Sequence, residues 1–253
     1  MIVCKSPAEL EKMRAANQLV AQVLEELAAM VAPGVTTADL DAAAEARVRA
    51  AGAEPAFKGY RGYPATLCAS VNEQVVHGIP NRTALASGDI VSLDMGVKLN
   101  GYYGDSAVTV PVGTGDENVR KLLRVTREAL DKGIAQVKVG GRISDIGHAI
   151  QAHVEANGFS VVREFVGHGI GASLHEEPQI ANYGEPGRGP RLAEGMTLAI
   201  EPMVNMGKAA VRVLADGWTA VTRDGSLSAH FEHTVAVTRD GPLVLTLRPV
   251  AAL

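Results

Sequence analysis

The stretch Gly88–Val110, GDIVSLDMGVKLNGYYGDSAVTV, decides the fold, because it predicts a long β-hairpin. Its Asn100-Gly101 pair is a strong signal for a two-residue turn, since type I′ turns need a positive φ at both central residues. On one face of the first strand the side chains are apolar, at Val91, Leu93, Met95 and Val97. We expect this face to lie in the core and the rest of the chain to be organised around the hairpin.

Two aspartates lie on the predicted hairpin. If Asn100 and Gly101 form the loop, Asp94 pairs with Ala107, and Asp105 is the diagonal neighbour of Asp94 on the same face. Diagonal neighbours lie roughly 7–8 Å apart, so both carboxylates can reach one small space. Two unpaired carboxylates repel, more strongly when buried, and a cation between them removes that cost. The alternative is a pair of solvated side chains, and the hairpin alone does not decide between the two.

The sequence also repeats itself at an offset of 106 residues: Gly34, Asp39, Leu40, Val48, Ala50 and Gly52 match Gly140, Asp145, Ile146, Val154, Ala156 and Gly158. With one more residue inserted, segment 85–88 matches segment 192–195, and the same register places Asp94 opposite Glu201. Each half therefore consists of two helices followed by strands, and each contributes one acid from the same place. We expect a pseudo-twofold α+β fold with helices outside, a central curved antiparallel sheet inside, and the acids near the axis.

The remaining patterns set the expected elements. Helices are predicted from a Ser6 capping box to residue 31, from Thr36 or Thr37 to residue 51, over 117–137 and over 144–157. Strands are predicted over 66–71 and over 230–237. The expected organisation is one catalytic domain over 1–253, with halves of roughly 6–110 and 116–204 and C-terminal hairpins over 205–253.

Composition excludes several classes of protein. The 253 residues are 47% hydrophobic with a mean hydropathy of +0.09, and the net charge is −4 without a basic run, so no nucleic-acid footprint is present. No apolar stretch approaches the ~20 residues of a membrane span, and the N-terminus lacks the apolar segment of a signal peptide. Cys4 and Cys68 are too few for a disulfide framework. Together these features predict a cytoplasmic protein.

A second chemical signal is Phe165–Pro178, FVGHGIGASLHEEP. His168 lies among glycines that let backbone approach a site closely, and His175 follows near two acids. Two histidines in such a run favour a ligand role over a structural one. The chain has no HExxH helix, no GxSxG elbow and no Walker loop, so zincin, serine-hydrolase and P-loop chemistry are not indicated.

Three motifs together resemble the type I methionine aminopeptidases: HGIGxxxHEEP at 168–178, DxGxxxxGYxxD at 94–105, and AIEPM at 199–203. The resemblance covers essentially the whole chain and implies the pita-bread fold. It also implies two divalent metal ions, of cobalt, manganese, iron or zinc, which the sequence does not distinguish. The metal ligands that it implies are Asp94, Asp105, His168, Glu201 and Glu232, with Asp105 and Glu232 bridging both ions.

The resemblance implies further roles. Glu201 would move a proton, His175 would hydrogen-bond the scissile carbonyl, and His77 would hold the nitrogen side of the departing peptide. The side-chain pocket would be Phe57, Tyr60, Tyr63, Cys68, Leu174 and Trp218. Phe57 stands where the family more often has a small residue or Cys, and Leu174 where it has an aromatic, so the two departures compensate in bulk. A monovalent cation is expected near Asn72 and Ser228.

The implied activity is removal of N-terminal methionine from nascent polypeptides, at the ribosome, when the second residue is small, by a monomeric enzyme. The alternatives are a related Xaa-Pro aminopeptidase or prolidase, and a non-catalytic binding protein on the same fold. The repeat starts near residue 10, which leaves no room for the N-terminal domain of the first alternative, and the helical insertion of type II enzymes is missing. Loss of ligands would mark a binding protein, and all five are present.

Overall fold

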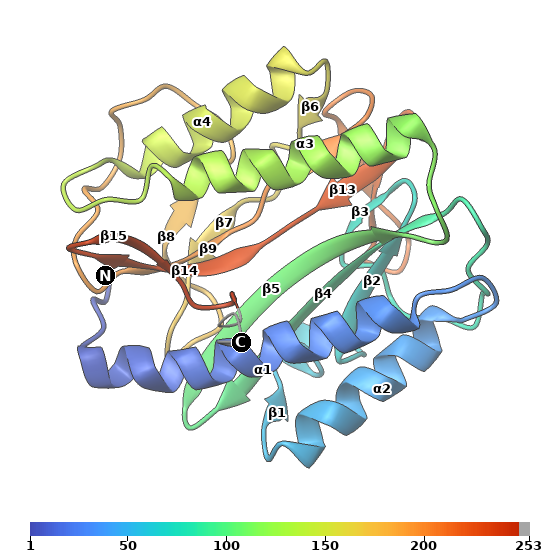
Figure 1. Ribbon diagram of the computed structural model, residues 1–253, viewed down its shortest axis with the longest axis horizontal. Helices are drawn as coiled ribbons and strands as arrows, with labels where there is room; N and C mark the ends of the chain where they lie inside the picture. The colour runs from blue at the N-terminus through green and yellow to red at the C-terminus, as the bar shows by residue number, and fades with distance from the viewer. Residues whose placement is uncertain (248–253) are drawn as a thin grey trace, which may run out of the picture.

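The computed structural model describes residues 1–247 (Figure 1). Its helices are α1 (Pro7–Met30), α2 (Thr37–Ala50), α3 (Glu117–Ile134) and α4 (Ile143–Ala156), with a single 3₁₀ turn, η1, at Tyr60–Gly62. The predicted helices are therefore confirmed to within three residues at each end. Ser6 caps α1 with the expected capping box, in which its side chain accepts from the Glu9 N–H, and Thr36 caps α2 in the same way.

Within residues 1–247 all strand pairs are antiparallel, and they form four sheets. One sheet contains β1 (Glu54–Pro55), β2 (Leu67–Val71), β4 (Ile90–Leu99) and β5 (Tyr102–Pro111), and another has the order β15 (Gly241–Val244), β14 (His233–Thr238), β9 (Thr197–Ile200), β7 (Gly167–Gly169) and β8 (Glu176–Ile180). The two smaller sheets are β13 (Ser228–His230), β10 (Met203–Asn205) and β6 (Ser160–Val161), and β11 (Val211–Val213), β12 (Ala220–Thr222) and β3 (Gln74–Val76).

The central hairpin has the predicted register. Leu99 pairs with Tyr102 across the turn, and Asp94 pairs with Ala107. Asn100 and Gly101 have φ of +53° and +82°, as a type I′ turn requires. The apolar face of β4 is fully buried and packs in one core cluster with residues of α1 and α2. Burial of this face holds the two helices against the hairpin.

The predicted repeat has a structural counterpart in two matching turns. The Gly34 N–H donates to the Leu85 carbonyl at 2.8 Å, and the Gly140 N–H donates to the Leu192 carbonyl at the same distance. Both glycines have positive φ, of +92° and +86°. A short antiparallel bridge follows each turn, and the helix that begins next, α2 or α4, carries an aspartate at its third position. The duplicated helix-helix-strand halves are thus present in the fold.

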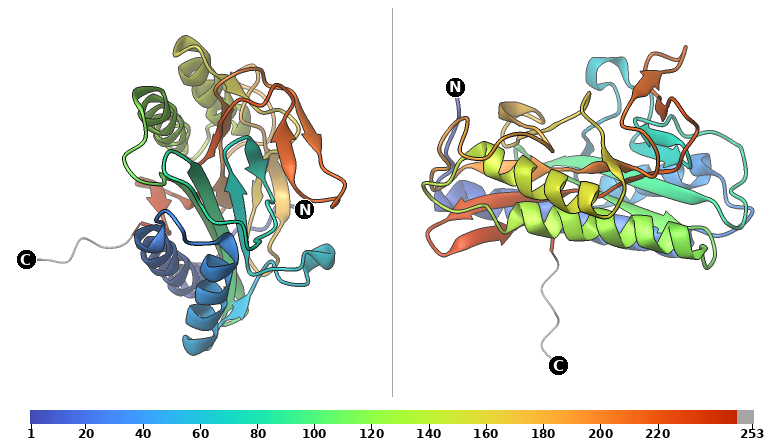
Figure 2. Two further views of the ribbon diagram at one scale, coloured as in Figure 1. Left: turned by 90° about the vertical axis from the view of Figure 1, so that its right-hand side faces the viewer. Right: turned by 90° about the horizontal axis from the view of Figure 1, so that it is seen from above.

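The helices and the irregular loops lie on opposite sides of the strands. Long helices α1 and α3 run across one face, with α2 and α4 beside them, as the two side views show (Figure 2). Loops near residues 60 and 215 project from the other side (Figure 2). A second large cluster of buried residues lies between α3, α4 and strands β9, β10 and β14. The helix layers therefore close one side of the sheet and leave the other open to a site.

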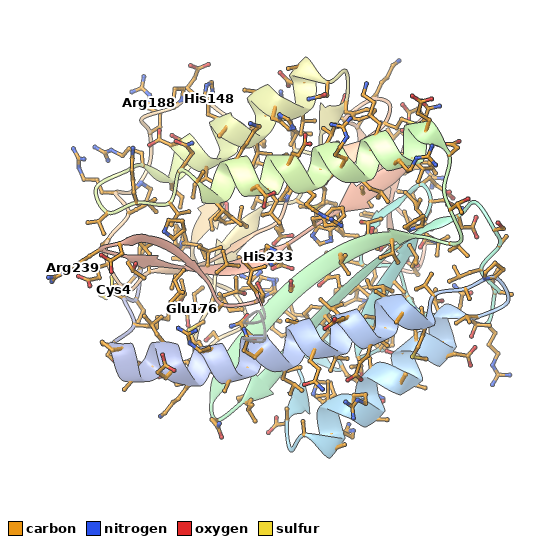
Figure 3. The ribbon with its side chains drawn as sticks, in the orientation of Figure 1. Cys4, His148, Glu176, Arg188, His233 and Arg239 are labelled. Atoms are coloured by element: carbon orange, nitrogen blue, oxygen red, sulfur yellow. The ribbon has the colours of Figure 1, made fainter. Side chains whose placement is uncertain are left out.

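The strand predicted over 230–237 is interrupted. Residues 228–230 form β13 in one sheet and residues 233–238 form β14 in another, with Phe231 and Glu232 between them. The Glu232 N–H donates to the Ala107 carbonyl at 3.0 Å, so this break joins β5 to the second half. His233 lies on the helix-covered face, between α1 and α3 (Figure 3), and hydrogen-bonds Thr246 at 2.8 Å. The change of pairing partner coincides with Glu232, which lines the cavity on the open face of the sheet.

The predicted C-terminal hairpins are present as β11–β12 and β14–β15. The part of the expected 205–253 region beyond residue 247 lies outside the described residues. The single-domain boundaries and the limits of the two halves stay predictions. Within residues 1–247, no helix combines the length and the apolar character that a bilayer crossing requires.

Candidate metal centre and active site

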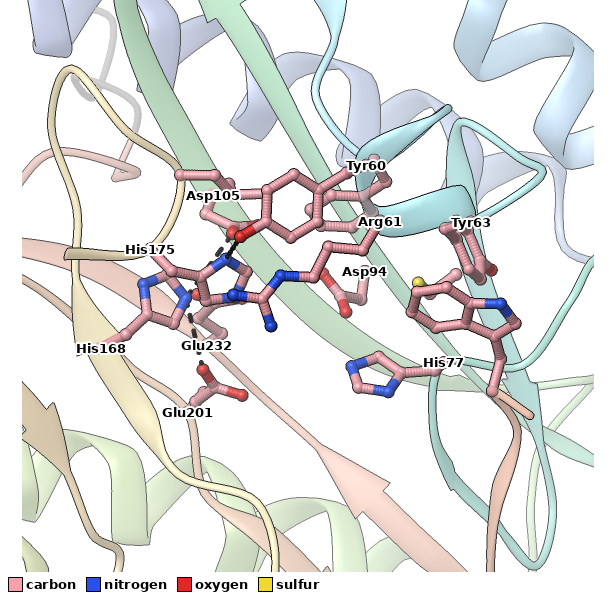
Figure 4. Close-up of a pocket in the computed structure, with 14 residues that line it drawn as sticks. Tyr60, Arg61, Tyr63, His77, Asp94, Asp105, His168, His175, Glu201 and Glu232 are labelled. Atoms are coloured by element: carbon pink, nitrogen blue, oxygen red, sulfur yellow. Dashed lines mark hydrogen bonds and ion pairs between the residues drawn. The ribbon is translucent and has the colours of Figure 1, made fainter. Parts of the chain in front are cut away.

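A cavity of about 170 Å³ opens on the loop side of the sheet (Figure 4). Its lining residues come from both halves of the chain: Phe57, Tyr60, Arg61, Tyr63, Cys68, His77, Asp94, Asp105, His168, Leu174, His175, Glu201, Trp218 and Glu232. The structure therefore brings together, in one cavity, every residue that the sequence predicted as a divalent-metal ligand, catalytic group or pocket wall. It adds Arg61, which the sequence analysis did not single out.

The four acidic side chains of the cavity lie on, or directly beside, strands that pair with each other. Asp94 lies on β4 and Asp105 lies on β5, while Glu201 follows the last residue of β9 and Glu232 precedes β14. The Asp105 N–H donates to Asn17 of α1, and its carbonyl accepts from the Thr234 hydroxyl at 2.8 Å. These two hydrogen bonds hold the backbone of Asp105 against both α1 and β14, and so fix the point from which its carboxylate enters the site.

One group of side chains has the geometry of a metal site. Ligand atoms of Asp105, His168 and Glu232 all lie within 4.8 Å of one another. His168 Nε2 is 3.9 Å from an Asp105 oxygen and 3.7 Å from a Glu201 oxygen. Its Nδ1 is 2.9 Å from the Gly169 carbonyl, which can only accept, so Nδ1 carries the proton and Nε2 presents a lone pair to the cavity. Burial lowers the pKa of His168 to about 3, which keeps the ring neutral.

The carboxylates around this cavity lack compensation from the protein. Asp94 Oδ1, Asp105 Oδ1 and Glu232 Oε1 are buried without a hydrogen-bond partner. Burial, and then repulsion by neighbouring acids, raises the pKa of Asp94 and Glu232 well above the usual range, and burial raises that of Glu201 to about 8. Such a cluster is costly unless cations occupy it. One imidazole and several carboxylates fit Mn²⁺, Fe²⁺ or Co²⁺ and accept Zn²⁺.

Two further histidines face the cavity. His175 Nδ1 is 2.9 Å from the Tyr60 hydroxyl, and the two rings stack at 5.2 Å. His77 packs its ring edge-on against Phe165 and Trp218 at 5.4 and 6.3 Å. Burial lowers the pKa of both histidines, to about 4 for His77. Both rings are therefore neutral at pH 7 and offer one N–H donor and one acceptor each.

The other side of the cavity is an apolar pocket. Phe57 packs both with the cluster that contains Leu174 and with the cluster of Tyr63 and Cys68. Tyr63 turns its hydroxyl away, donating to the Leu67 and Gly78 carbonyls, and meets the Trp218 ring edge-on at 5.1 Å. Since burial raises the pKa of the Cys68 thiol, it stays protonated and serves as an apolar wall. Phe57 and Leu174 border the same space, as a compensating pair requires.

Asn72 and Ser228, by contrast, lie outside the cavity. The Ser228 N–H donates to the Asn72 carbonyl at 3.0 Å, and the Asn72 side chain bridges Asp89 and the Ile90 N–H. Asn72 has a φ of +56°, which turns its backbone sharply. The monovalent cation expected beside these residues stays a prediction.

Two residues of the site were missed by sequence reasoning. Arg61 lies between Tyr60 and Gly62 in the run GYRGY, and the two glycines of this run were the local signal of an unusual loop. His230 is fully buried with both ring nitrogens unpaired, and its Nε2 lies 3.6 Å from a Glu201 oxygen. Burial lowers the pKa of His230 to about 3, so it is a neutral neighbour of Glu201. Its position two residues before Glu232, in a run of polar residues within a strand, was the available signal.

Comparisons of the sequence with known proteins all indicate the same family. The model of metallopeptidase family M24 matches residues 11–239. The chain is 55% identical over 246 residues to methionine aminopeptidase 1 of Bacillus subtilis (strain 168), covering 97% of this chain and 99% of that protein. It is 48% identical over 250 residues to methionine aminopeptidase 1 of Mycobacterium tuberculosis (strain CDC 1551 / Oshkosh), covering 96% and 94%.

Solved structures agree with the sequences. The crystal structure of a methionine aminopeptidase from Thermotoga maritima superimposes with a TM-score of 0.96 at 51% identity, covering 98% of this chain and 100% of that chain. A prolidase from Pyrococcus furiosus shares the fold alone, with a TM-score of 0.79 at 22% identity over 66% of its chain. The pita-bread fold is thus confirmed, and the chain belongs to metallopeptidase family M24 and, within it, to the methionine aminopeptidases.

Proposed function

We propose that this chain removes the N-terminal methionine from proteins and peptides whose second residue is small, by hydrolysis at a dinuclear metal centre. The observation that carries the proposal is the set of buried, unpaired carboxylates of Asp94, Asp105 and Glu232 at the floor of a cavity with an apolar side pocket. The charged floor suits two divalent cations and the α-amino group of a substrate, and the side pocket suits a thioether.

The residues that would hold the two ions are Asp94, Asp105, His168, Glu201 and Glu232, all of which line the cavity. Bound there, the two metal ions would lower the pKa of a bound water and would polarise the scissile carbonyl. The native metal among manganese, iron, cobalt and zinc stays open.

The proton steps belong to the chain's own residues. Glu201 accepts the proton of the attacking water and returns it to the nitrogen of the leaving amine, a transfer that suits a carboxylate at the edge of the cluster. Its side chain keeps 14% of its surface exposed, which leaves room for a water beside it. His230, 3.6 Å from the other Glu201 oxygen, limits the directions in which that carboxylate can turn.

Histidines position the peptide bond. With Tyr60 donating its hydroxyl proton to His175 Nδ1, the Nε2–H of His175 is free to donate to the scissile carbonyl oxygen. His77, held by Phe165 and Trp218 across the cavity, would hydrogen-bond the nitrogen side of the departing peptide. The two imidazole rings would thus hydrogen-bond the scissile peptide bond from opposite sides.

The proposed specificity has two parts. Phe57, Tyr63, Cys68, Leu174 and Trp218 would surround the methionine side chain. The second residue would be restricted to a small side chain, because Tyr60 and His175 stack beside the exit and narrow it.

The substrates that we propose are the N-termini of nascent polypeptides, met in the cytoplasm and at the ribosome. We also propose that the chain acts as a monomer, since this chain by itself supplies the implied metal ligands and the walls of the side-chain pocket.

The test is turnover of two peptides by protein loaded with Mn²⁺, Fe²⁺, Co²⁺ or Zn²⁺. We expect Met-Ala-Ser to be cleaved between Met and Ala, and a Lys-Pro peptide to be left intact, with chelation abolishing the activity. Cleavage of the Lys-Pro peptide alone would assign the chain to the prolidase-like branch of the fold. Metal binding without turnover of either peptide would mark a binding protein.

A further inference from the structure

Arg61 lies at the mouth of the cavity in an unusual backbone conformation. It belongs to η1, between Gly59 and Gly62, and has a φ of +49° where its two glycine neighbours have +86° and +90°. A left-handed conformation is uncommon for a residue other than glycine, asparagine or aspartate. Its side chain extends along the mouth of the cavity toward His175 (Figure 4), and the residue remains exposed to solvent.

The guanidinium is held by an aromatic ring and not by an acid. It lies 5.4 Å from the centroid of Tyr60, whose hydroxyl and ring are in turn held by His175. Within residues 1–247, no carboxylate lies at ion-pair distance from it. Lys58, three residues earlier on the same segment, shows the contrast, since its ammonium is 2.6 Å from Glu45. Arg61 is therefore an oriented cation with free donors.

The guanidinium of Arg61 is the main positive charge that the protein itself places at the cavity. Among the residues that line the cavity, Arg61 is the one lysine or arginine, and the histidines there are neutral. The four carboxylates of the floor offset two divalent cations, so the loaded floor carries little net charge. The acids of the floor are deeply set, whereas Arg61 and His175 are exposed. When the first residue of a peptide is bound at the floor, its later residues must extend through this exposed side and pass the guanidinium of Arg61.

We propose that Arg61 is a specificity-determining residue, and that its guanidinium binds a carboxylate which the substrate carries beyond its second residue. This inference rests on the proposed aminopeptidase function. The carboxylate has two sources, an acidic side chain at the third position or the C-terminus of a short peptide, and Arg61 recognises both through the same paired N–H donors. A cationic third residue is repelled by the same charge.

The experiment compares three tetrapeptide amides that differ only at the third position: Met-Ala-Asp-Gly, Met-Ala-Asn-Gly and Met-Ala-Lys-Gly. We expect kcat/KM to fall in that order, by about 3- to 10-fold from Asp to Lys, mostly through KM, as an exposed charge pair allows. The order should flatten in 1 M salt, because screening shortens the reach of the charge to about 3 Å. Met-Ala-Ser as the free acid should outperform its amide, which tests the second source.

Arg61→Gln should abolish both preferences, and Arg61→Lys should retain them in part. Lys58→Gln is the matched control, since it removes a cation from the same segment that is already paired with Glu45. An unchanged Asp-to-Lys ratio in Arg61→Gln, or an equal change in Lys58→Gln, overturns the proposal.

Binding gives the same comparison without turnover. Trp218 is the only tryptophan in the chain and lines the cavity, so its emission reports peptide binding. If no peptide is cleaved but the Asp peptide binds more tightly and Arg61→Gln removes the difference, the role of Arg61 stands and the proposed aminopeptidase function fails. Equal affinities for the Asp and Lys peptides overturn the role of Arg61 whether or not they are cleaved.

Discussion

Asp105 is the residue on which the contacts of the cavity converge. Its backbone is bound by Asn17 and by Thr234, and its carboxylate lies near His168. Its charge helps to raise the pKa of both Asp94 and Glu232. The position of Asp105 links the helix layer, the hairpin β14–β15 and the candidate metal centre, so its loss affects each of them.

We expect Asp105→Asn and Glu232→Gln to lose metal and to lower kcat by at least about 100-fold. Under the proposed function each carboxylate would help to hold both ions, and even the loss of a group that only hydrogen-bonds to a metal ligand costs about 10–100-fold. Both substitutions keep the side-chain volume, so the loss reflects charge. Metal content by elemental analysis and turnover of Met-Ala-Ser should be measured on the same samples. Asp240→Asn, in the exposed turn before β15, is the control. Two retained metals and a normal rate in either variant would contradict the shared-ligand roles.

The roles of single residues could be predicted from the sequence where the residues belong to a recognisable motif or repeat, and could not be predicted where they do not. Asp94 and Glu201 follow from a register that repeats, and the structure places both in the cavity. Arg61 could not be predicted, because its inward direction depends on a backbone φ of +49° that nothing in the residue type demands. The position of His230 near Glu232 was a weak signal, but its approach to Glu201 joins segments about thirty residues apart and could not be predicted.

At the level of elements, the contact between α1 and β5 controls the position of the site. A Cβ built on Gly104 would lie 2.8 Å from the Ala16 carbonyl carbon and from the Asn17 nitrogen. The helix therefore rests directly on the strand, one residue before Asp105. The hairpin turn could be predicted because Asn100-Gly101 encodes it locally, whereas this close approach of helix and strand could not.

Gly104→Ala should push α1 away from β5 and lower the free energy of unfolding by about 1–3 kcal/mol, the usual cost of overpacking. Because Asp105 is adjacent, metal affinity should fall as well. Gly101→Ala in the same hairpin meets no atom within 4 Å and carries only the strain of a φ of +82°. It should lower stability in urea unfolding while metal binding, measured by calorimetry, stays normal. Equal metal affinity in both variants would show that the α1 contact does not position Asp105.

The interrupted strand shows the limit of local patterns. Alternation over 230–237 predicted one strand, because period-two patterning does not say which partner each residue meets. In the fold, β13 pairs with β10 and β14 pairs with β9, and the switch between them sets Glu232 against Ala107. Non-local pairing decided this element, and it is also what brings an acid from the C-terminal region to the site.

For the whole molecule, the buried acids predict how stability depends on pH without metal. Glu201 has its pKa raised from 4.5 to about 8, and Asp94, Asp105 and Glu232 are raised well above their usual values. The folded state then binds more protons than the unfolded state, so the free energy of unfolding falls as pH rises. The buried histidines, with pKa values of about 3 to 4, are neutral in the folded state above pH 7. In the unfolded state they keep only a minor share of their protons at pH 7 and lose it by pH 8, so they oppose the trend weakly and only near pH 7.

We therefore expect the Tm of chelator-treated protein to fall between pH 7 and pH 8. The free energy of unfolding should fall by up to about 1.4 kcal/mol per pH unit for each proton released. Added Mn²⁺ should raise Tm and reverse the trend, since ligands bind metal more tightly once deprotonated. Glu201→Gln should make the metal-free slope shallower. Calorimetric scans at several pH values test this, and a metal-free Tm that rises over that window would refute the repulsion among the acids.

The two matched turns and the equivalent places of Asp94 and Glu201 have a consequence for ancestry. A chain of half this length, paired with its own copy about the same axis, would hold two identical acids there, and every substitution would appear on both sides at once. Joining the halves into one gene product frees each side to change alone. One side now carries Asp94 and the other Glu201, which reaches one methylene further. An asymmetric centre of this kind can distinguish the N-terminus of a bound peptide from its C-terminus.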